Sequence, residues 1–177
     1  IQNCLIYDNT AEVEGGGVKF HYSSGKLLNC TIVNNIAPAG SGLTVSENPI
    51  DIINSIIYDN QIQLIHSPIV SIAYSNIQGL NTIFDNCPEC EILDGNIDAD
   101  PEFTDPENGD FTLQPSSPCI DAGDPESELD PDGTRADMGA YYYHQEPEVL
   151  GCTDPEACNY DEAATTNDGS CEYEVDC

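Results

Sequence analysis

The sequence predicts an all-β fold, a parallel β-helix (solenoid). Two observations support this: a repeat of about 25 residues in the first 80 positions, and short apolar or alternating runs rich in β-branched residues. Gly, Asn and Pro interrupt these runs, which is typical of strands joined by turns, and no helical period is present. A fixed period of 20 to 50 residues is typical of solenoids.

The repeat occurs in two registers. The segments of the first register lie at 4–9, 30–35 and 55–60, with a weaker copy from Ser75. In the second register, the glycine-containing segment 15–20 aligns with 40–45, also 25 residues later. Because both registers share one spacing, each period is expected to form one turn of stacked strands.

Stacking places equivalent residues directly above one another. We therefore expect three columns: an inward aliphatic column, a smaller inward column, and an asparagine column at a tight corner. They are Ile6, Ile32 and Ile57; Cys4, Cys30 and Ser55; and Asn9, Asn35 and Asn60. Asparagine tolerates a left-handed backbone, and its amide can bond the copies above and below. The glycine runs at 15–17 and 40–42 suit a second corner where backbones approach closely.

The charge is strongly negative and unevenly distributed. The chain has 177 residues, with 33 acidic and 3 basic residues and a net charge of −30. Residues 1–80 hold six acidic and two basic residues, so the remaining 27 acids and one base lie in 81–177. This field excludes nucleic acid, polyanions and acidic membrane surfaces as partners. No apolar run approaches the roughly 18 residues of a membrane span, so membrane insertion is not expected.

Several motifs after residue 73 resemble the C-terminal part of secreted bacterial right-handed β-helix proteins. They are the segments 74–79, 96–103, 109–113, 117–124 and 130–141. The resemblance covers about residues 1–144 and implies a right-handed parallel β-helix whose loop-rich C-terminal segment closes the end of the solenoid. The insertion Cys87-Pro88-Glu89-Cys90 departs from that pattern and is expected to be a local loop.

The last segment resembles a different module. Residues 151–161 and 167–173 are similar to short cysteine-rich repeats near the C-termini of bacterial surface proteins. The resemblance implies an extracellular accessory module without specifying a ligand. We therefore expect a β-helix with its closing segment at 1–144, a linker at 145–150 and a small, acidic, disulfide-stapled tail at 151–177.

Nine cysteines in a chain of this length indicate a disulfide framework and an oxidising compartment. The tail is too small for an adequate core, so two disulfides are expected among Cys152, Cys158, Cys171 and Cys177. Three pairings are possible, and a zinc site is the alternative. Cys87 and Cys90 are expected to form a loop disulfide, either with each other or with Cys119.

Carboxylates suggest calcium as a cofactor, because calcium prefers six to eight oxygen ligands. One candidate set in the tail is Asp154, Asn159, Asp161, Asn167, Asp168 and Glu172. A second is Asp121, Asp124, Asp130, Asp132 and Asp137. Neither set follows the full EF-hand spacing, and the alternative is that these residues cap turns. Arg135, nearly alone among acids, is expected to pair with a carboxylate.

No catalytic arrangement is evident. A polysaccharide lyase needs a cationic group and a base, and only Lys19, Lys26 and Arg135 are basic. Asp8 and Asp59 fall two repeats apart and are interpreted as turn residues. We expect a non-catalytic extracellular or cell-surface protein, namely a stalk, adhesin or filament component, stabilised by disulfides and calcium. The alternative is a fragment of a secreted polysaccharide-binding or polysaccharide-degrading β-helix enzyme.

The start of the first repeat bears on the expected partners. The chain enters directly on a strand at Ile1, and an uncovered solenoid end exposes strand edges that invite further pairing. Either further turns precede Ile1 in the natural protein, or another copy stacks on this end. The expected partners are copies of the chain stacked end to end, or cell-surface glycans.

Overall fold

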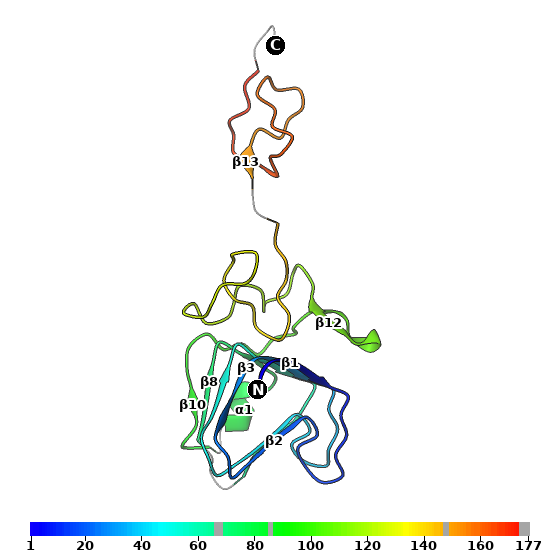
Figure 1. Ribbon diagram of the computed structural model, residues 1–177, viewed down its shortest axis with the longest axis vertical. Coiled ribbons are helices and arrows are strands. Elements are labelled where there is room, and N and C mark those ends of the chain that lie inside the picture. The colour runs from blue at the N-terminus through cyan, green and yellow to red at the C-terminus, as the bar shows by residue number, and fades with distance from the viewer. Residues whose placement is uncertain (66–68, 85–86, 147–148, 174–177) are drawn as a thin grey trace. The chain divides into compact units, whose positions relative to one another are not determined.

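The computed structural model describes residues 1–65, 69–84, 87–146 and 149–173. The chain divides into two compact units, Ile1–Tyr143 and His144–Cys177. Each unit is described by itself below (Figure 1).

The main element of the first unit is a parallel sheet of seven strands. They are β1 (Gln2–Tyr7), β3 (Gly25–Val33), β5 (Ile50–Ile53), β6 (Ile56–Tyr58), β8 (Val70–Ala73), β9 (Asn76–Ile77) and β10 (Glu91–Ile92). The order is β10-β8-β5-β3-β6-β9, and β1 pairs with β3. The nine-residue β3 therefore contacts β5 through its first half, β6 through its second half, and β1 on its other side.

A second parallel sheet contains β2 (Val18–His21), β4 (Leu43–Ser46) and β7 (Ile62–Ile65), in that order. Its register pairs Val18 with Leu43 and Leu43 with Ile62. The expected close approach of the glycine runs is confirmed beside this sheet. A Cβ on Gly16 would lie 2.5 Å from the carbonyl oxygen of Ser41, so only glycine fits there.

The predicted right-handed β-helix is wrong. The seven strands form an open, curled sheet resembling half a barrel, accompanied by small sheets, and the described chain does not close into a solenoid. A solenoid needs every turn to supply a strand to the same closed set of sheets. Here the second sheet has only three strands, whereas β3 runs without interruption through the curled one. The 25-residue period therefore indicates parallel pairing between neighbouring strands. Such pairing occurs in an open sheet as well as in a solenoid.

The repeat register itself is observed. Cys4 pairs with Cys30, Ile6 with Ile32, and Ile32 with Ile57. The corner prediction needs a correction of one position. The left-handed residues are Asp8, Asn34 and Asp59, immediately before the asparagine column. A further left-handed set, Asn3, Asn29, Asn54 and Tyr74, lies within or beside the strands of the curled sheet.

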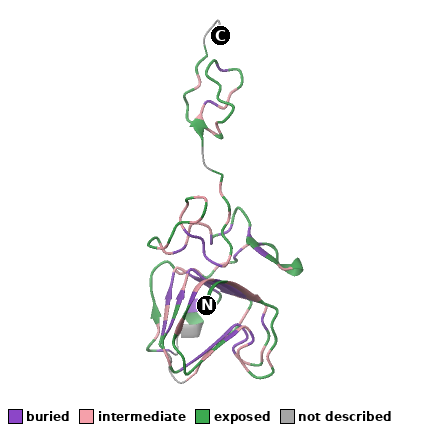
Figure 2. Cartoon of the chain, viewed as in Figure 1, coloured by how far each residue is buried: buried purple, intermediate pink, exposed green. Residues whose placement is uncertain are grey.

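The core of the first unit lies mainly on the inward side of the curled sheet. Its largest cluster joins alternate residues of several strands, including Leu27, Ile32, Leu43, Ile52 and Ile72, all fully buried. Figure 2 shows this burial concentrated on the strands. The short helix α1 (Leu80–Phe84) contributes Leu80 to the same cluster.

A second cluster covers the outward side of β3 and β6. An antiparallel hairpin contributes to it, formed by β11 (Phe103–Asp105), the 3₁₀ turn η1 (Pro106–Asn108) and β12 (Asp110–Leu113). Val33 and Ile56 pack there with Phe111 and Met138. The backbone N–H of Gly139 also donates to the carbonyl of Asn54 at 2.8 Å. Residues 103–139 thus cover a face of the sheet, whereas the sequence predicted that this segment closes an end.

The second unit contains one small parallel sheet of β13 (Leu150–Gly151) and β14 (Thr166–Asn167). The disulfide between Cys152 and Cys171 links the two ends of the segment 152–171. Apart from an isolated bridge between Cys152 and Tyr160, the other described residues of this unit form turns and loops, in keeping with its small size. In the described parts of both units, helices are too short or too polar to cross a membrane.

Candidate functional site

The first unit has a groove of about 470 Å³ between the curled sheet and the β11–β12 hairpin. One wall comes from the C-terminal ends of β3 and β6 and the turns after them. The opposite wall comes from the hairpin and the residues flanking it. Its lining consists of Val33, Asn34, Tyr58, Asp59, Asp100, Glu102, Phe103, Pro106, Glu107 and Gln114. We call this cavity the acidic groove.

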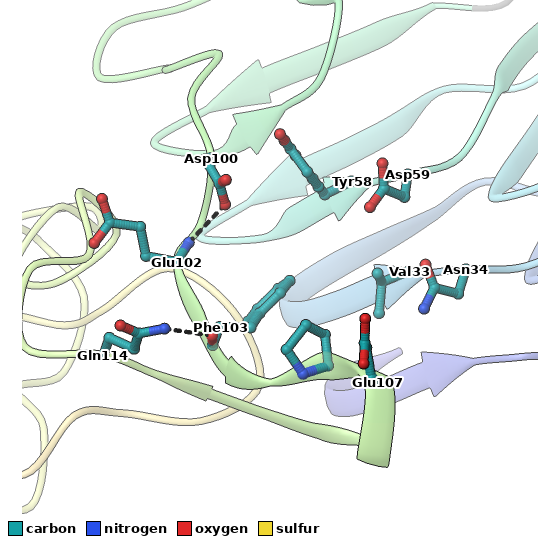
Figure 3. Close-up of a pocket in the computed structure, with 10 residues that line it drawn as sticks. Val33, Asn34, Tyr58, Asp59, Asp100, Glu102, Phe103, Glu107 and Gln114 are labelled. Carbon is teal, nitrogen blue, oxygen red and sulfur yellow. Dashed lines mark hydrogen bonds between the residues drawn. The ribbon is translucent and has the colours of Figure 1, made fainter.

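Four carboxylates line the acidic groove, and none of its lining residues is cationic. Figure 3 shows Asp59 and Asn34 side by side, each directly after the end of a neighbouring strand, with Glu107 facing them from the hairpin. Asp59, Asp100 and Glu107 are exposed, and Glu102 is half-buried. Tyr58 and Phe103 add aromatic surface to the lining. The groove therefore combines negative charge with apolar contact area.

Local backbone geometry positions the polar side chains of the groove. Asn34, Asp59 and Glu102 all have positive φ angles, between 51° and 56°, which turn the chain sharply beside the groove. The backbone N–H of Asp59 donates to Gln78 Oε1 at 2.9 Å, and that of Glu102 donates to Asp100 Oδ1 at 2.9 Å. On the far wall, Gln114 Nε2 donates to the carbonyl of Phe103 at 2.8 Å. These bonds fix the backbone at both walls.

The electrostatic field of the groove acts on its own tyrosine. Burial raises the pKa of Tyr58, and the nearby carboxylates of Asp100, Asp59 and Asp98 raise it further. Negative charges disfavour the tyrosinate because it would add another negative charge among them. The same field favours a bound positive charge.

The tail residues predicted to bind calcium are used in local turns. Each of four side chains accepts a backbone N–H two residues later: Asp154 from Glu156, Asp161 from Ala163, Asn167 from Gly169 and Asp168 from Ser170. Asn159 Oδ1 accepts the N–H of Glu172. The bonds from Tyr173 and Ser170 also lower the pKa values of Asp154 and Asp168, respectively. These contacts agree with turn capping, the alternative reading of this set.

The second predicted calcium set is partly brought together. Asp137 is 5% exposed, and its two oxygens accept the backbone N–H groups of Asp121 and Tyr143 at 2.7 and 2.6 Å. Asp130 accepts the N–H of Asp137, while Asp132 and Asp124 cap turns at Thr134 and Glu126. Burial raises the pKa of Asp137 to about 6, and the charges of Asp130 and Asp121 add to the effect. These carboxylates are therefore neighbours.

No group of three His, Cys, Asp or Glu side chains suits a metal ion, as far as residues 1–65, 69–84, 87–146 and 149–173 are concerned. Calcium binding by either set stays a prediction.

The cysteines follow the predicted framework in part. Cys87 pairs with Cys90, which is one of the two expected options, and Cys119 is a buried free thiol. In the tail Cys152 pairs with Cys171, while Cys177 lies outside the described residues. The expected pairing of Arg135 with a carboxylate stays a prediction, and two other contacts of this side chain are seen. Its Nε donates to the carbonyl of Gly123 at 2.7 Å, and its guanidinium lies 5.7 Å from the ring centre of Tyr74.

Sequence reasoning missed the acidic groove. It singled out Asp59 only as a turn residue beside Asn34, and it gave no role to Asp100, Glu102 or Glu107. The available signal was the recurrence of Asp or Asn before the asparagine column, which places Asn34 and Asp59 side by side. For the opposite wall the sequence offered no comparable pattern, because the hairpin is not part of the 25-residue repeat.

Comparisons identify no relative: the chain matches no family model, and no curated protein or solved structure matches it. The predicted resemblance of residues 1–144 to bacterial right-handed β-helix proteins is therefore wrong. The resemblance of the tail to a cysteine-rich surface module is likewise unsupported. What remains is a mostly β protein with parallel sheets and disulfides between Cys87 and Cys90 and between Cys152 and Cys171.

Proposed function

We propose that this chain is a non-catalytic, extracellular adhesive protein whose acidic groove binds a Lys or Arg side chain of a partner protein. The observation that carries the proposal is the groove itself: its lining includes four acidic residues and two aromatic residues, and no cationic residue. A side chain with an apolar stem and a charged head matches both properties. The disulfides support the extracellular setting, where such bonds persist.

The net charge of −30 supports the same partner class. A strongly negative protein attracts basic surfaces from a distance, and this attraction weakens as salt screens it. A cell-surface glycan, one of the two partner classes expected from the sequence, would instead use the amides and aromatic rings of the groove. Its binding would not depend on the charge of the carboxylates.

A matched pair of peptides tests the proposal. A short lysine-containing peptide is compared with the same peptide bearing acetylated lysines, because acetylation removes the charge. We expect the charged peptide to bind at least about tenfold more tightly, with an affinity that falls as salt increases. The readout is the dissociation constant from a fluorescence titration.

Two variants locate the binding. Asp59→Asn and Glu107→Gln each remove a negative charge from the groove without changing side-chain size, and Asn tolerates the left-handed backbone at position 59. Together they should weaken the charged peptide about tenfold, as expected for two partly screened ion pairs. Asp51→Asn removes an exposed charge from β5, outside the lining, and should change little. If Asp51→Asn weakens binding as much as Asp59→Asn and Glu107→Gln together, the assignment to this groove is refuted.

A further inference from the structure

Two free thiols lie side by side in the curled sheet, at the positions of the smaller column in β1 and β3. Cys4 and Cys30 are paired residues of these parallel strands. Both sulfurs have the same orientation. The Cys4 thiol donates to the carbonyl of Gln2 at 3.1 Å, and the Cys30 thiol donates to that of Leu28 at 3.3 Å. Because Gln2 is in turn paired with Leu28, the two sulfurs lie on the same side of neighbouring strands.

Both side chains belong to the inward side of the sheet. Cys30 is 0% exposed within the largest core cluster, and Cys4 is half-buried and packs against the same cluster. Burial raises the pKa of the Cys30 thiol, whereas a hydrogen bond with the backbone of Cys4 acts in the opposite direction. That hydrogen bond places the Cys30 sulfur directly against its neighbour in β1.

The next two members of this column are serines. The backbone N–H of Cys30 donates to Ser55 Oγ, and that of Ser55 donates to Ser75 Oγ, both at 3.1 Å. Each hydroxyl also donates to the carbonyl two residues earlier in the chain, as the two thiols do. A hydroxyl therefore satisfies the hydrogen bonds of the column, and these bonds do not account for sulfur at two neighbouring positions.

The third free thiol of the described chain, Cys119, lies in a different cluster. It packs with the residues on the outward side of β3 and β6, and its sulfur accepts a hydrogen bond from Asn76 Nδ2 at 3.2 Å. The disulfide between Cys87 and Cys90 already occupies the other two cysteines that belong to the largest cluster or pack against it. Cys4 and Cys30 are therefore the one pair of free thiols that the described residues bring together.

We propose that Cys4 and Cys30 form a disulfide that joins β1 to β3 when the protein meets a low-molecular-weight disulfide such as oxidised glutathione. Neighbouring strands of a sheet are about 4.8 Å apart, and disulfides span Cα separations of about 4.4 to 6.8 Å, so the backbone can stay in place. The side chains only have to rotate away from the carbonyls that they now contact. The site is independent of the acidic groove and of the partner proposed for that groove.

The reaction consists of two successive thiol–disulfide exchanges. Cys4, the less buried of the two, loses its proton and attacks one sulfur of oxidised glutathione, so that an S–S bond forms at Cys4 Sγ and one glutathione thiolate leaves. Cys30 then loses its proton and attacks Cys4 Sγ, which releases the second glutathione thiolate. The two thiolates take up the two protons, so both cysteines are oxidised and one glutathione disulfide is reduced. Because burial raises the pKa of Cys30, the second exchange should be faster at higher pH.

The positions of the basic residues make this bond straightforward to detect. Trypsin cuts after Lys19 and Lys26, and so separates the peptide 1–19, which holds Cys4, from the peptide 27–135, which holds Cys30. The native protein is incubated with oxidised glutathione, its remaining thiols are alkylated during denaturation, and it is digested. We expect the two peptides to stay linked in most molecules without reductant and to separate with it. A second digestion, beside aromatic residues, separates Cys30 from the later cysteines and identifies the partner of Cys4.

Matched variants complete the test. Cys30→Ser, whose hydroxyl suits the column as it does at Ser55, should release the peptide 1–19, whereas Cys119→Ser should leave it linked. On oxidation the melting temperature of the parent should rise by about 5 °C more than that of Cys30→Ser, because the bond closes the loop from 4 to 30.

The peptide map of the parent decides the proposal even if Cys30→Ser perturbs folding. Cys4 that is alkylated, bound only to glutathione, or linked to a cysteine other than Cys30 after oxidation of the native protein would overturn it. A link between Cys4 and Cys30 that forms only in the unfolded chain would also overturn it, because the fold would then not direct the pairing.

Discussion

At the scale of single residues, the acidic and amide side chains of this protein mainly bond the backbone. Both oxygens of Asp137 are bonded by backbone N–H groups, and the Asp and Asn residues of the tail cap turns two residues ahead. Such bonds replace those that regular secondary structure would supply in a loop-rich segment. Much of the acidic composition therefore has a structural role that does not require a bound ion.

Asp137 predicts how stability depends on pH. Burial raises its folded-state pKa to about 6, above its ordinary value of 3.8. The folded state therefore binds the proton first, and stability increases as pH falls from above 6 towards 4. Below the unfolded pKa this gain is complete, and it is lost as pH rises through 6. The full effect amounts to about 3 kcal/mol, because each unit of pKa shift is worth about 1.4 kcal/mol.

The measurement is the difference in melting temperature between pH 7 and pH 5. Asp137→Asn should show a smaller rise on acidification than the parent protein, because position 137 no longer titrates. Asp94→Asn, which changes an exposed carboxylate, should retain the parental rise. An undiminished rise in Asp137→Asn would show that other groups account for the pH dependence.

At the scale of elements, the β11–β12 hairpin both completes the fold and builds the groove. The Phe111 ring lies 5.2 Å from that of Tyr7 and 5.3 Å from that of Phe103, measured between ring centres. It is 2% exposed and packs on the outward side of β3 and β6 with Val33 and Ile56. Phe111 is thus the most deeply buried of the hairpin side chains that anchor it to the sheet, together with Phe103 and Leu113.

Replacing that anchor should loosen the hairpin. Phe111→Ala is expected to lower the free energy of unfolding by about 3 kcal/mol, as large core truncations do. It should also accelerate amide exchange in β11 and β12 more than in β5 or β8. Leu129→Ala, at a side chain that is 62% exposed, should change stability by less than about 0.5 kcal/mol. Uniform acceleration across all strands would contradict the local anchoring role.

The sequence predicted pairing between neighbouring strands and failed on longer-range architecture. A 25-residue spacing identifies which residues lie beside one another, as with Ile32 and Ile57, because pairing is local to adjacent repeats. Whether paired strands close into a coil depends on where the sheet curls, and an open curled sheet has the same spacing. The contact of Phe111 with Tyr7 joins segments more than 100 residues apart and leaves no periodic signal.

At the scale of the whole molecule, the negative field supports the proposed class of partner. The net charge is −30, and the carboxylates of the acidic groove lie without a cationic lining residue beside them. Composition alone predicts that nucleic acid is not a partner. It could not locate the groove, because the two walls come from the repeat and from the hairpin. The proposed adhesive function depends on that convergence.

Nuclear magnetic resonance mapping of the lysine peptide tests this central claim most directly. We predict that the largest amide shift changes fall on both walls of the groove, at Asn34, Asp59, Glu102 and Gln114, and that the acetylated peptide produces none of them. Changes confined to residues 149–173, or equal changes with the two peptides, would contradict the account.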